Sequence, residues 1–288
     1  MSAVVPSGLV STAHSRRVVS FYGRLLPRLR RTPDSLAMHL GFWDGETESH
    51  AEAAVNMNRV LSKRVELRPG ERVLDAGCGF GGSAIWLAEE VGAKVVGVNL
   101  APDQIYHARR LAYLRGLSHR VAFEREDFTR TSFPDESFDV VWAVESVCHT
   151  GDKPGFLSEA RRLLKPDGRL VVADFFRTGR SFEADEERLL REWLSGWAVP
   201  DLATVGIFCE LARHAGFADL RFEDATANVW PSLRRIRRRA VAGYPAAGLV
   251  RAMGLGNPEH VSLARAGLRQ YEALRRGLWL YGIFAATV

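Results

Sequence analysis

Hydrophobic and polar positions follow two alternating periods in the middle of the chain, from about residue 46 to residue 176. Short apolar runs predict buried strands, and longer segments with apolar residues three or four positions apart predict helices. The predicted strands are residues 72–75, 94–99, 121–125, 138–144 and 169–173. The predicted helices are residues 49–67, 83–92, 103–117 and 153–164. Strands that alternate with helices are typical of an α/β fold with a parallel sheet.

Helical patterns dominate the rest of the chain. Two further strands are predicted at residues 219–224 and 278–288, and the segments with helical periodicity are residues 184–196, 206–216, 233–251 and 259–276. We therefore expect one α/β core, with helical segments before it and helical segments between it and a closing strand.

The composition excludes several classes of protein. The chain has 288 residues, of which 47% are hydrophobic and 25% charged, as in ordinary globular proteins. Its three cysteines, Cys78, Cys148 and Cys209, lack the spacing of a disulfide framework or a zinc site. No apolar segment has the length of a membrane span or the pattern of a signal peptide, so we expect a cytoplasmic protein. No nucleic-acid-binding signature accompanies the net charge of +5.

Charge is distributed unevenly along the chain. Residues 1–40 carry six arginines and one acidic residue, residues 230–288 carry ten arginines and two glutamates, and the segment between them is acidic. Two interpretations stay open: the basic ends dock on the acidic core, or they close over an anionic ligand. Two interpretations also stay open for the arginines of one predicted helix, which are Arg234, Arg235, Arg237, Arg238 and Arg239. They form either a solvated helix face or a site for a diphosphate.

The sharpest local signal is a glycine-rich turn after the first predicted strand. Residues 73–82 read Val-Leu-Asp-Ala-Gly-Cys-Gly-Phe-Gly-Gly. Glycine is needed where the backbone takes a positive φ or where a ligand touches the main chain. A dinucleotide-binding turn would read GxGxxG and would have an acid at the end of the second strand, where this chain has Asn99. Asp75 is instead placed to pair with a cation or an amino group.

With this turn and three later motifs, residues 70–176 resemble a class I S-adenosylmethionine-dependent methyltransferase. The later motifs are Glu-Asp-Phe at residues 126–128, Phe-Asp-Val-Val-Trp at residues 138–142 and Leu-Leu-Lys-Pro-Asp-Gly-Arg-Leu at residues 163–170. The resemblance implies a Rossmann-like sheet with helices on both faces, S-adenosylmethionine as cofactor and S-adenosylhomocysteine as its product. In particular, Asp127 would accept a hydrogen bond from the adenine amine. The full set of implied cofactor contacts is Tyr22, Asp75, Gly77, Cys78, Gly79, Gly81, Asn99, Leu100, Gln104, Asp127 and Phe128.

Residues that follow the fourth predicted strand point to the methyl acceptor. Ligands of open α/β sheets lie at the carboxyl ends of the strands, where Glu145 and His149 are expected. Their segment, Glu-Ser-Val-Cys-His, resembles the Glu-Ala-Thr-Cys-His stretch of sterol and other isoprenoid C-methyltransferases, and residues 39–43 resemble the substrate side of small-molecule methyltransferases. Methylation of an alkene leaves a carbocation, which needs aromatic faces and a carboxylate or imidazole. We therefore predict Glu145, with His149, as base or cation partner, and acceptor contacts from Trp43, Trp193, Trp197 and Trp230.

Three activities remain open on these residues. The first is C-methylation of an alkene in a prenyl or terpenoid substrate of secondary metabolism. The second is O- or N-methylation of a small-molecule natural product with His149 as the base. The third is a cofactor-binding cyclase that transfers no methyl group. No metal site is predicted, and magnesium is expected only if the acceptor is a diphosphate.

The resemblance also divides the chain by role. It implies an N-terminal helical lid at residues 1–45, a cofactor-binding core at residues 46–230, a helical cap over the acceptor at residues 231–276 and a closing strand of the core at residues 277–288. The expected partner is a small hydrophobic acceptor, to which an anionic group would suit the basic ends of the chain. Neither nucleic acid nor a membrane is expected as a partner, and a homo-oligomer stays open.

Overall fold

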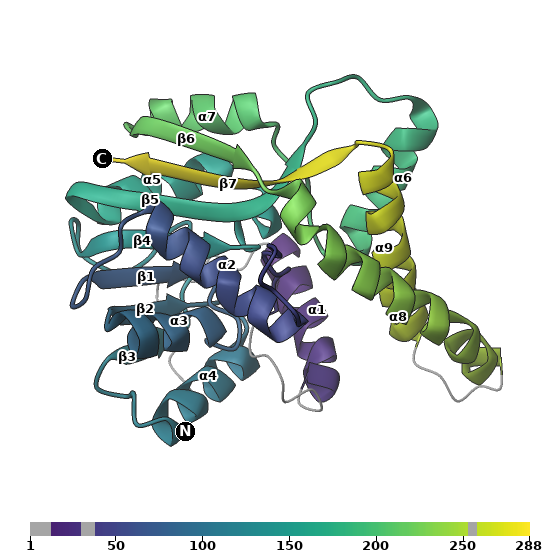
Figure 1. Cartoon of the computed structure of the whole chain (residues 1–288), viewed down its shortest axis with the longest axis horizontal. Coiled ribbons are helices and arrows are strands. Elements are labelled where there is room, and N and C mark those ends of the chain that lie inside the picture. The colour runs from purple at the N-terminus through teal and green to yellow at the C-terminus, as the bar shows by residue number, and fades with distance from the viewer. Residues whose placement is uncertain (1–12, 30–37, 253–257) are drawn as a thin grey trace.

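The structure is a computed structural model, and it describes residues 13–29, 38–252 and 258–288. Within these residues, seven strands form one mixed sheet in the order β3-β2-β1-β4-β5-β7-β6 (Figure 1). Strands β1 to β5 are parallel, whereas β7 is antiparallel to both of its neighbours. The strands are β1 (Arg72–Ala76), β2 (Lys94–Val98), β3 (Val121–Glu124), β4 (Phe138–Val144), β5 (Leu164–Arg177), β6 (Ala218–Asp224) and β7 (Trp279–Thr287).

Helices cover both faces of this sheet (Figure 1). In the described residues they are α1 (Ala13–Leu29), α2 (His50–Arg64), α3 (Gly82–Trp86), α4 (Pro102–Leu114), α5 (Lys153–Leu163), α6 (Ala184–Gly196), α7 (Val205–His214), α8 (Thr226–Ala252) and α9 (Pro258–Arg275). Two short helical turns, η1 (Leu87–Val91) and η2 (Val147–His149), complete the list. None of the helices among the described residues is long and apolar enough to cross a membrane.

The core explains why the strands could be recognised as continuous apolar runs. Val73 and Val140 of neighbouring strands pack in the cluster that includes α2, α3 and α4, whereas Leu74 and Val141 pack in the cluster that includes α5 and α7. Successive strand residues point to opposite faces, and both faces of a sheet covered by helices are buried. The predicted Rossmann-like sheet with helices on both faces is confirmed.

The bounds of several elements differ from the prediction. Strand β5 continues to Arg177, well beyond the predicted residues 169–173, because its second half pairs with β7. The helix predicted at residues 83–92 is α-helical only as far as Trp86, continues as the π-helical turn η1 and stops at Gly92, which has a φ of 77°. Helix α8 begins at Thr226 instead of residue 233. Periodicity locates elements better than their ends, because end residues depend on tertiary partners.

Helices α6, α8 and α9 pack together beside the sheet, and we call this group the helical cap (Figure 1). The predicted cap, residues 231–276, contains α9 and most of α8. Helix α6 is a further member, because it packs against α9.

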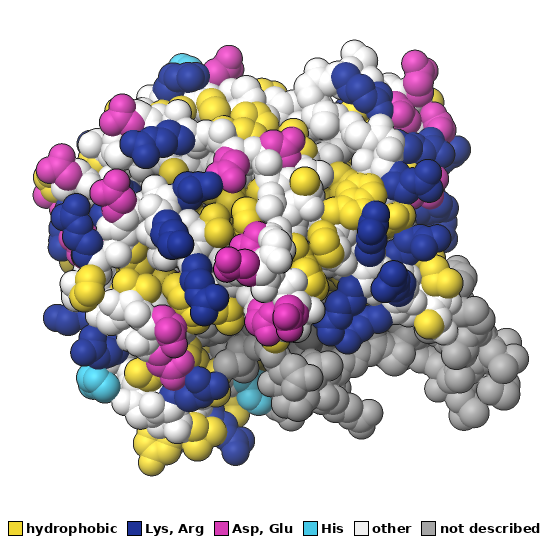
Figure 2. All heavy atoms as spheres, in the orientation of Figure 1, with side chains coloured by type: hydrophobic (Ala, Val, Ile, Leu, Met, Phe, Trp, Pro, Cys, Tyr) yellow, Lys and Arg dark blue, Asp and Glu magenta, His cyan; other side chains and the backbone are white. Residues whose placement is uncertain are grey.

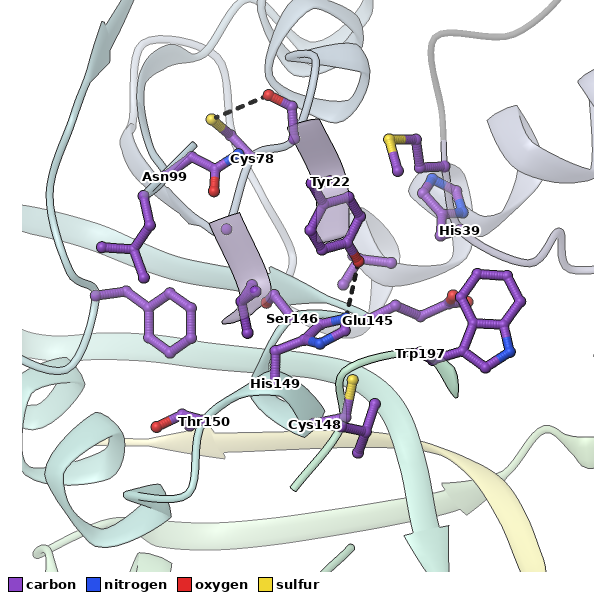
Figure 3. A pocket seen from close by; sticks show the side chains of 18 of the residues that line it. Tyr22, His39, Cys78, Asn99, Glu145, Ser146, Cys148, His149, Thr150 and Trp197 are labelled. Atoms are coloured by element: carbon purple, nitrogen blue, oxygen red, sulfur yellow. Dashed lines mark hydrogen bonds between the residues drawn. The ribbon is translucent and has the colours of Figure 1, made fainter. Parts of the chain in front are cut away.

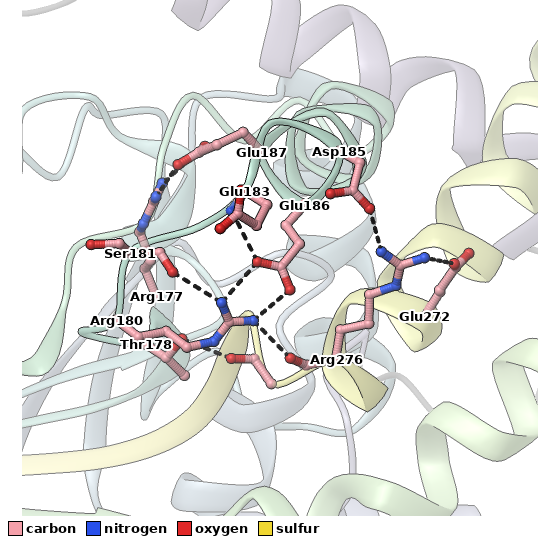
Figure 4. A network of polar contacts seen from close by, with 11 residues as sticks. Arg177, Thr178, Arg180, Ser181, Glu183, Asp185, Glu186, Glu187, Glu272 and Arg276 are labelled. Atoms are coloured by element: carbon pink, nitrogen blue, oxygen red, sulfur yellow. Dashed lines mark hydrogen bonds and ion pairs between the residues drawn. The ribbon is translucent and has the colours of Figure 1, made fainter.

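An ion-pair network joins the cap to the end of β5 (Figure 4). Arg180 pairs with Glu186 of α6 at 2.7 Å and donates to the carbonyl oxygen of Arg276 at 3.0 Å. Arg276 in turn pairs with Asp185 at 2.7 Å, and Arg177 pairs with Glu187. The acidic first turn of α6 therefore holds arginines, and no cluster of three or more potential metal ligands occurs in the described residues.

Candidate active site

A cavity of about 770 Å³ lies at the carboxyl ends of β1, β2 and β4. Its wall combines the glycine-rich turn after β1 with residues of α1, of the helical cap and of the segment before α2. Figure 3 shows Cys78 and Asn99 on one side of the cavity, His39 and Trp197 on the other, and Glu145 between them. We call the first side the turn end and the second side the cap end.

The turn end is built from backbone that glycine adopts most easily. Gly77 and Gly79 line the cavity, with Cys78 between them, and have φ values of 88° and 53°. A Cβ at Gly77 would lie 2.4 Å from Cβ of Ser146, whereas a Cβ at Gly79 would meet no protein atom within 4 Å. A side chain at Gly79 would therefore extend into the cavity, where a ligand would lie.

The third predicted glycine, Gly81, has a different role. It does not line the cavity, and a Cβ there would lie 2.5 Å from the ring of Phe123. Its φ is 81°. The structure thus places Gly81, a predicted cofactor contact, behind the cavity wall, where this glycine allows the turn to pack closely against β3.

Asp75 lies beneath the turn and is only 3% exposed. Burial raises the pKa of its carboxyl to about 7, although the backbone amide of Ala84 donates to it. Its Oδ2 has no hydrogen-bond partner among the described residues. Because an unpaired buried carboxylate oxygen is costly, this wall of the cavity suits a ligand that brings a donor, such as an amino group.

Two side-chain amides, of Asn99 and Gln104, also belong to this end of the cavity. Asn99, Leu100 and Gln104 line it, and Asn99 Nδ2 donates to Gln104 Oε1 at 2.7 Å. Two amides held in this way offer both donors and acceptors to ligand hydroxyls.

Asp127 and Phe128 lie on the same wall of the cavity. Asp127 Oδ1 accepts from the backbone N and the Oγ1 of Thr129, at 3.0 and 2.7 Å. The ring of Phe128 packs edge-on against Phe156 with a centroid distance of 5.6 Å. The turn end therefore combines a carboxyl with one unpaired oxygen, two amides and a flat ring, which are chemically suited to the amino-acid, ribose and adenine parts of S-adenosylmethionine.

Glu145 is fixed by two donors that reach the same carboxylate oxygen. The backbone N of Leu40 and the hydroxyl of Tyr281 donate to Oε1 at 2.7 and 3.0 Å. Glu145 has a φ of 48°, which is uncommon for a residue other than glycine and is typical of functional sites. Burial raises the pKa of this carboxyl to about 8. At neutral pH the group is therefore mostly protonated, whereas the predicted role as base or cation partner requires the carboxylate.

His149 has the opposite protonation preference. Its Nδ1 donates to the carbonyl oxygen of Ala198 at 3.3 Å, so in the neutral ring Nε2 is an acceptor, and the hydroxyl of Tyr22 donates to it at 2.8 Å. The hydrogen positions are assigned from these partners. Burial lowers the pKa of the imidazole to about 4 and raises that of the Tyr22 hydroxyl. His149 is thus neutral and accepts a hydrogen bond at the cavity wall (Figure 3).

Two of the four predicted tryptophans line the cap end, as their spacing on one helix face suggested. They are Trp193 and Trp197, at the end of α6. The Trp193 ring lies 4.8 Å from the ring of Trp279 and 5.7 Å from that of Phe175. Trp197 packs edge-on against Phe21 of α1 at 6.1 Å.

The other two tryptophans do not line the cavity. Trp43 donates from Nε1 to Ser232 Oγ at 2.8 Å, and the ring of Trp230 packs against Tyr271 at 5.6 Å. Both side chains join α8 to its neighbours, so the structure does not place these two predicted acceptor contacts at the cavity.

The arginine cluster of α8 also lies outside the cavity. Arg234, Arg237, Arg238 and Arg239 are exposed, and the guanidinium of Arg237 lies over the ring of Tyr271 at 5.2 Å. Figure 2 shows Lys and Arg side chains gathered over the cap helices at the molecular surface. Among the described residues that line the cavity, Arg130 is the only Arg or Lys. The four exposed arginines form a solvated face, and among the described residues a diphosphate in the cavity would meet one arginine, Arg130.

Several residues of the cap end were missed by the sequence reasoning. Tyr281 belongs to β7, Ile236 to α8 and Gln270 to α9, and all of them meet Glu145 or the cavity only after the chain folds. Of the segment 39–43, His39 and Leu40 line the cavity. In the sequence, only the resemblance of residues 39–43 to the substrate side of other methyltransferases pointed to this segment. It did not indicate that His39 lines the cavity and that Trp43 does not.

Comparisons with known proteins agree with this geometry. A family model described as "Methyltransferase domain" matches residues 74–172. The chain is 35% identical over 204 residues to 27-O-demethylrifamycin SV methyltransferase of Amycolatopsis mediterranei, which covers 70% of this chain and 74% of that protein. It is 32% identical over 182 residues to a sterol 24-C-methyltransferase of Gibberella zeae, covering 62% of this chain and 48% of that protein.

Solved structures extend the likeness to almost the whole chain. The [4+2]-cyclase SpnF matches with a TM-score of 0.78 at 25% identity and covers 98% of both chains. A mycolic acid cyclopropane synthase matches with a TM-score of 0.82 at 19% identity, covering 96% of this chain and 99% of that one. Sheet, turn and cavity together define an α/β methyltransferase. The chain belongs to the S-adenosylmethionine-dependent methyltransferases, as the resemblance of residues 70–176 predicted.

Proposed function

We propose that the protein transfers a methyl group from S-adenosylmethionine to a hydroxyl oxygen of a bulky, largely apolar natural product. The observation that carries the proposal is the hydrogen-bonded pair of Tyr22 and His149 on the cavity wall. The name of the relative at 35% identity places its methyl group on an oxygen of a rifamycin. The aromatic and aliphatic lining of the cap end suits an acceptor with a large apolar surface.

The turn end fits the cofactor. Asp75 Oδ2 lacks a donor that the amino group of the cofactor would supply, and the space above Gly79 is open. When bound, S-adenosylmethionine supplies the electrophilic methyl group. The residues proposed to hold it are Tyr22, Asp75, Gly77, Cys78, Gly79, Asn99, Leu100, Gln104, Asp127 and Phe128.

His149 and Tyr22 would remove the acceptor's proton. The lone pair of His149 Nε2 already receives the Tyr22 hydroxyl proton. The acceptor hydroxyl therefore gives its proton to the Tyr22 oxygen while the Tyr22 proton moves to Nε2. The carbonyl of Ala198 holds the Nδ1–H and keeps the ring in orientation. A hydrogen-bonded base of this kind typically accelerates a reaction by about 100-fold or more.

One observation favours a second candidate, the C-methylation of a prenyl or terpenoid alkene. Glu145 lies at the cavity wall next to Tyr281, and the ring of Tyr281 belongs to an aromatic group with Phe175, Trp193 and Trp279. Aromatic faces with a carboxyl group suit a transient carbocation. This candidate needs the ionised form of Glu145, although the pKa of the carboxyl is raised to about 8.

The product of the reaction tests the proposal. Purified protein is incubated with S-adenosylmethionine and a panel of hydroxylated macrolactams, phenols, sterols and prenyl compounds, and products are analysed by mass spectrometry and NMR. The proposal expects a gain of 14 daltons and a new methyl–oxygen bond. A new methyl–carbon bond would decide for the second candidate. A cyclised isomer without added mass would decide for a cyclase, which is the activity named for the structurally similar SpnF.

A further inference from the structure

Unsatisfied polar atoms gather around the cavity. In the described residues, six buried side-chain nitrogen or oxygen atoms have no hydrogen-bond partner, and four of them belong to residues that line the cavity. One of the four, Asp75 Oδ2, is at the turn end. The other three are at the cap end, where the proposed function places the acceptor: His39 Nε2, Trp197 Nε1 and Gln270 Oε1.

Their chemistry follows from the bonds that their residues already make. The Nδ1 of His39 donates to the carbonyl oxygen of Leu40 at 2.8 Å, and burial lowers the pKa of the ring, so Nε2 is a free acceptor. Gln270 is 3% exposed and its Oε1 is an acceptor, whereas the indole Nε1 of Trp197 can only donate. The residues of the cap end thus carry two unpaired acceptor atoms and one unpaired donor atom, each shielded from water, within a mostly apolar wall.

Contacts connect these residues to the centre of the cavity. Trp279 donates from Nε1 to the carbonyl oxygen of Gln270 at 3.1 Å, and its ring packs on Trp193, one turn before Trp197. His39 precedes Leu40, whose backbone N donates to Glu145. In Figure 3, His39 and Trp197 lie on the opposite side of Glu145 from Cys78.

We propose that His39, Trp197 and Gln270 form a polar subsite that selects acceptors with oxygen functions away from the methylated hydroxyl. The inference rests on the proposed function for the location of the acceptor. The substrate class is then a polyoxygenated compound, whose hydroxyls donate to His39 and Gln270 and whose oxygen accepts from Trp197. A plain hydrocarbon chain would leave all three groups unpaired, and sites built for a hydroxyl discriminate strongly against analogues that lack it.

Two isosteric probes test the subsite without turnover. Affinities of 2-naphthol and 2-methylnaphthalene, which differ by a hydroxyl in place of a methyl group, are measured by calorimetry with saturating S-adenosylhomocysteine. The proposal expects the naphthol to bind about tenfold more tightly or better, whereas a simple apolar cavity would prefer the hydrocarbon. Because the Tyr22–His149 pair can also hold the naphthol hydroxyl, variants of the subsite residues are needed to assign the preference. Failure of S-adenosylhomocysteine itself to bind would count against the cofactor assignment and not against the subsite.

Three variants assign the preference to these residues: Gln270→Leu, Trp197→Phe and His39→Phe, with the exposed Arg238→Gln as control. The variants should lose the preference for naphthol, and the control should keep it. Gln270→Leu should also melt at the same or a higher temperature than the native protein, because it removes an unpaired buried polar atom. A merely structural glutamine would lower the melting temperature. Tighter or equal binding of the hydrocarbon, no measurable binding of naphthol, or an unchanged preference in all three variants would overturn the proposal.

Discussion

The two ends of the cavity are assembled in different ways. The turn end comes from short contiguous segments that follow neighbouring parallel strands, such as residues 75–79, 99–104 and 127–128. The cap end comes from α1, α6, α8, α9 and the segment before α2, which are far apart in the sequence, and Tyr281 of β7 supports it through Glu145. Chemistry at the turn end is therefore carried by local backbone geometry, and chemistry at the cap end by side chains that tertiary packing brings together.

The largest expected effect is on cofactor binding at the turn end, and a matched control distinguishes loss of cavity volume from backbone strain. Gly79→Val should abolish cofactor binding measured by calorimetry, because its side chain would occupy open cavity space. Gly116→Val is the matched control: Gly116 also has a positive φ, 69°, and no atom within 4 Å of a Cβ, but it lies outside the cavity. The control carries similar backbone strain and should bind the cofactor normally. A folded Gly79→Val protein with unchanged affinity would contradict the assignment of this end.

Asp127 should show a smaller effect on the same affinity. Asp127→Ala should weaken cofactor binding by about 1–3 kcal/mol, the range for a buried hydrogen bond to a charged group. Because Asp127 also accepts from Thr129, the variant Thr129→Val serves as control, since it removes the 2.7 Å hydroxyl bond and leaves the carboxylate in place. An Asp127→Ala variant that binds normally and loses only turnover at saturating cofactor would sink this role.

The raised pKa of Glu145 predicts how stability changes with pH. The folded-state pKa of about 8 lies above the ordinary 4.5, so the stabilising contribution is present below pH 4.5 and is lost as pH rises toward 8. The difference in unfolding free energy between Glu145→Gln and native protein should grow in this range, by at most about 1.4 kcal/mol per pH unit. Denaturant unfolding at pH 5 to 8 measures it. The exposed Glu66→Gln, whose residue has a φ of 46°, is the control for the positive backbone angle. A flat difference for Glu145→Gln would mean an ordinary, ionised carboxyl.

The smallest effects are expected for Trp43 and Trp230, two predicted acceptor contacts that lie outside the cavity. Trp230→Phe and Trp43→Phe should leave the acceptor KM unchanged, because Trp230 faces Tyr271 and Trp43 faces Ser232. Trp193→Phe should raise the KM, since this ring lines the cap end. Steady-state kinetics with the identified acceptor compares the three. A raised KM in Trp230→Phe alone would place the acceptor on the other side of α8.

The same contrast explains how much could be predicted from the sequence. The strand–glycine–helix pattern around Gly77 predicted both the fold and the turn end, because backbone geometry there requires particular residues at particular spacings. Gly81 fitted the motif equally well, yet its glycine serves the contact with Phe123, which no local pattern reveals. Trp43 and Trp193 looked alike as candidates, and only the packing of α6 and α8 decided which of them meets the cavity.

The protonation states of Glu145 and His149 could not be predicted from the sequence either. A glutamate and a histidine four residues apart suggested a base and its partner. The structure gives them separate partners, Tyr281 and Tyr22, and burial shifts their pKa values in opposite directions, to about 8 and about 4. Those shifts depend on desolvation by distant segments, which the sequence does not display.

The most direct test of the account compares two isosteric variants in one assay. His149→Gln and Glu145→Gln are measured for methyl transfer at pH 7.5 and for S-adenosylhomocysteine affinity. Loss of the base in His149→Gln should lower turnover by about 100-fold or more with cofactor affinity nearly unchanged. Glu145→Gln should stay close to native activity, because glutamine resembles the protonated carboxyl. A Glu145→Gln variant that loses about 100-fold while His149→Gln remains active would contradict O-methylation through His149 and establish Glu145 as the catalytic group.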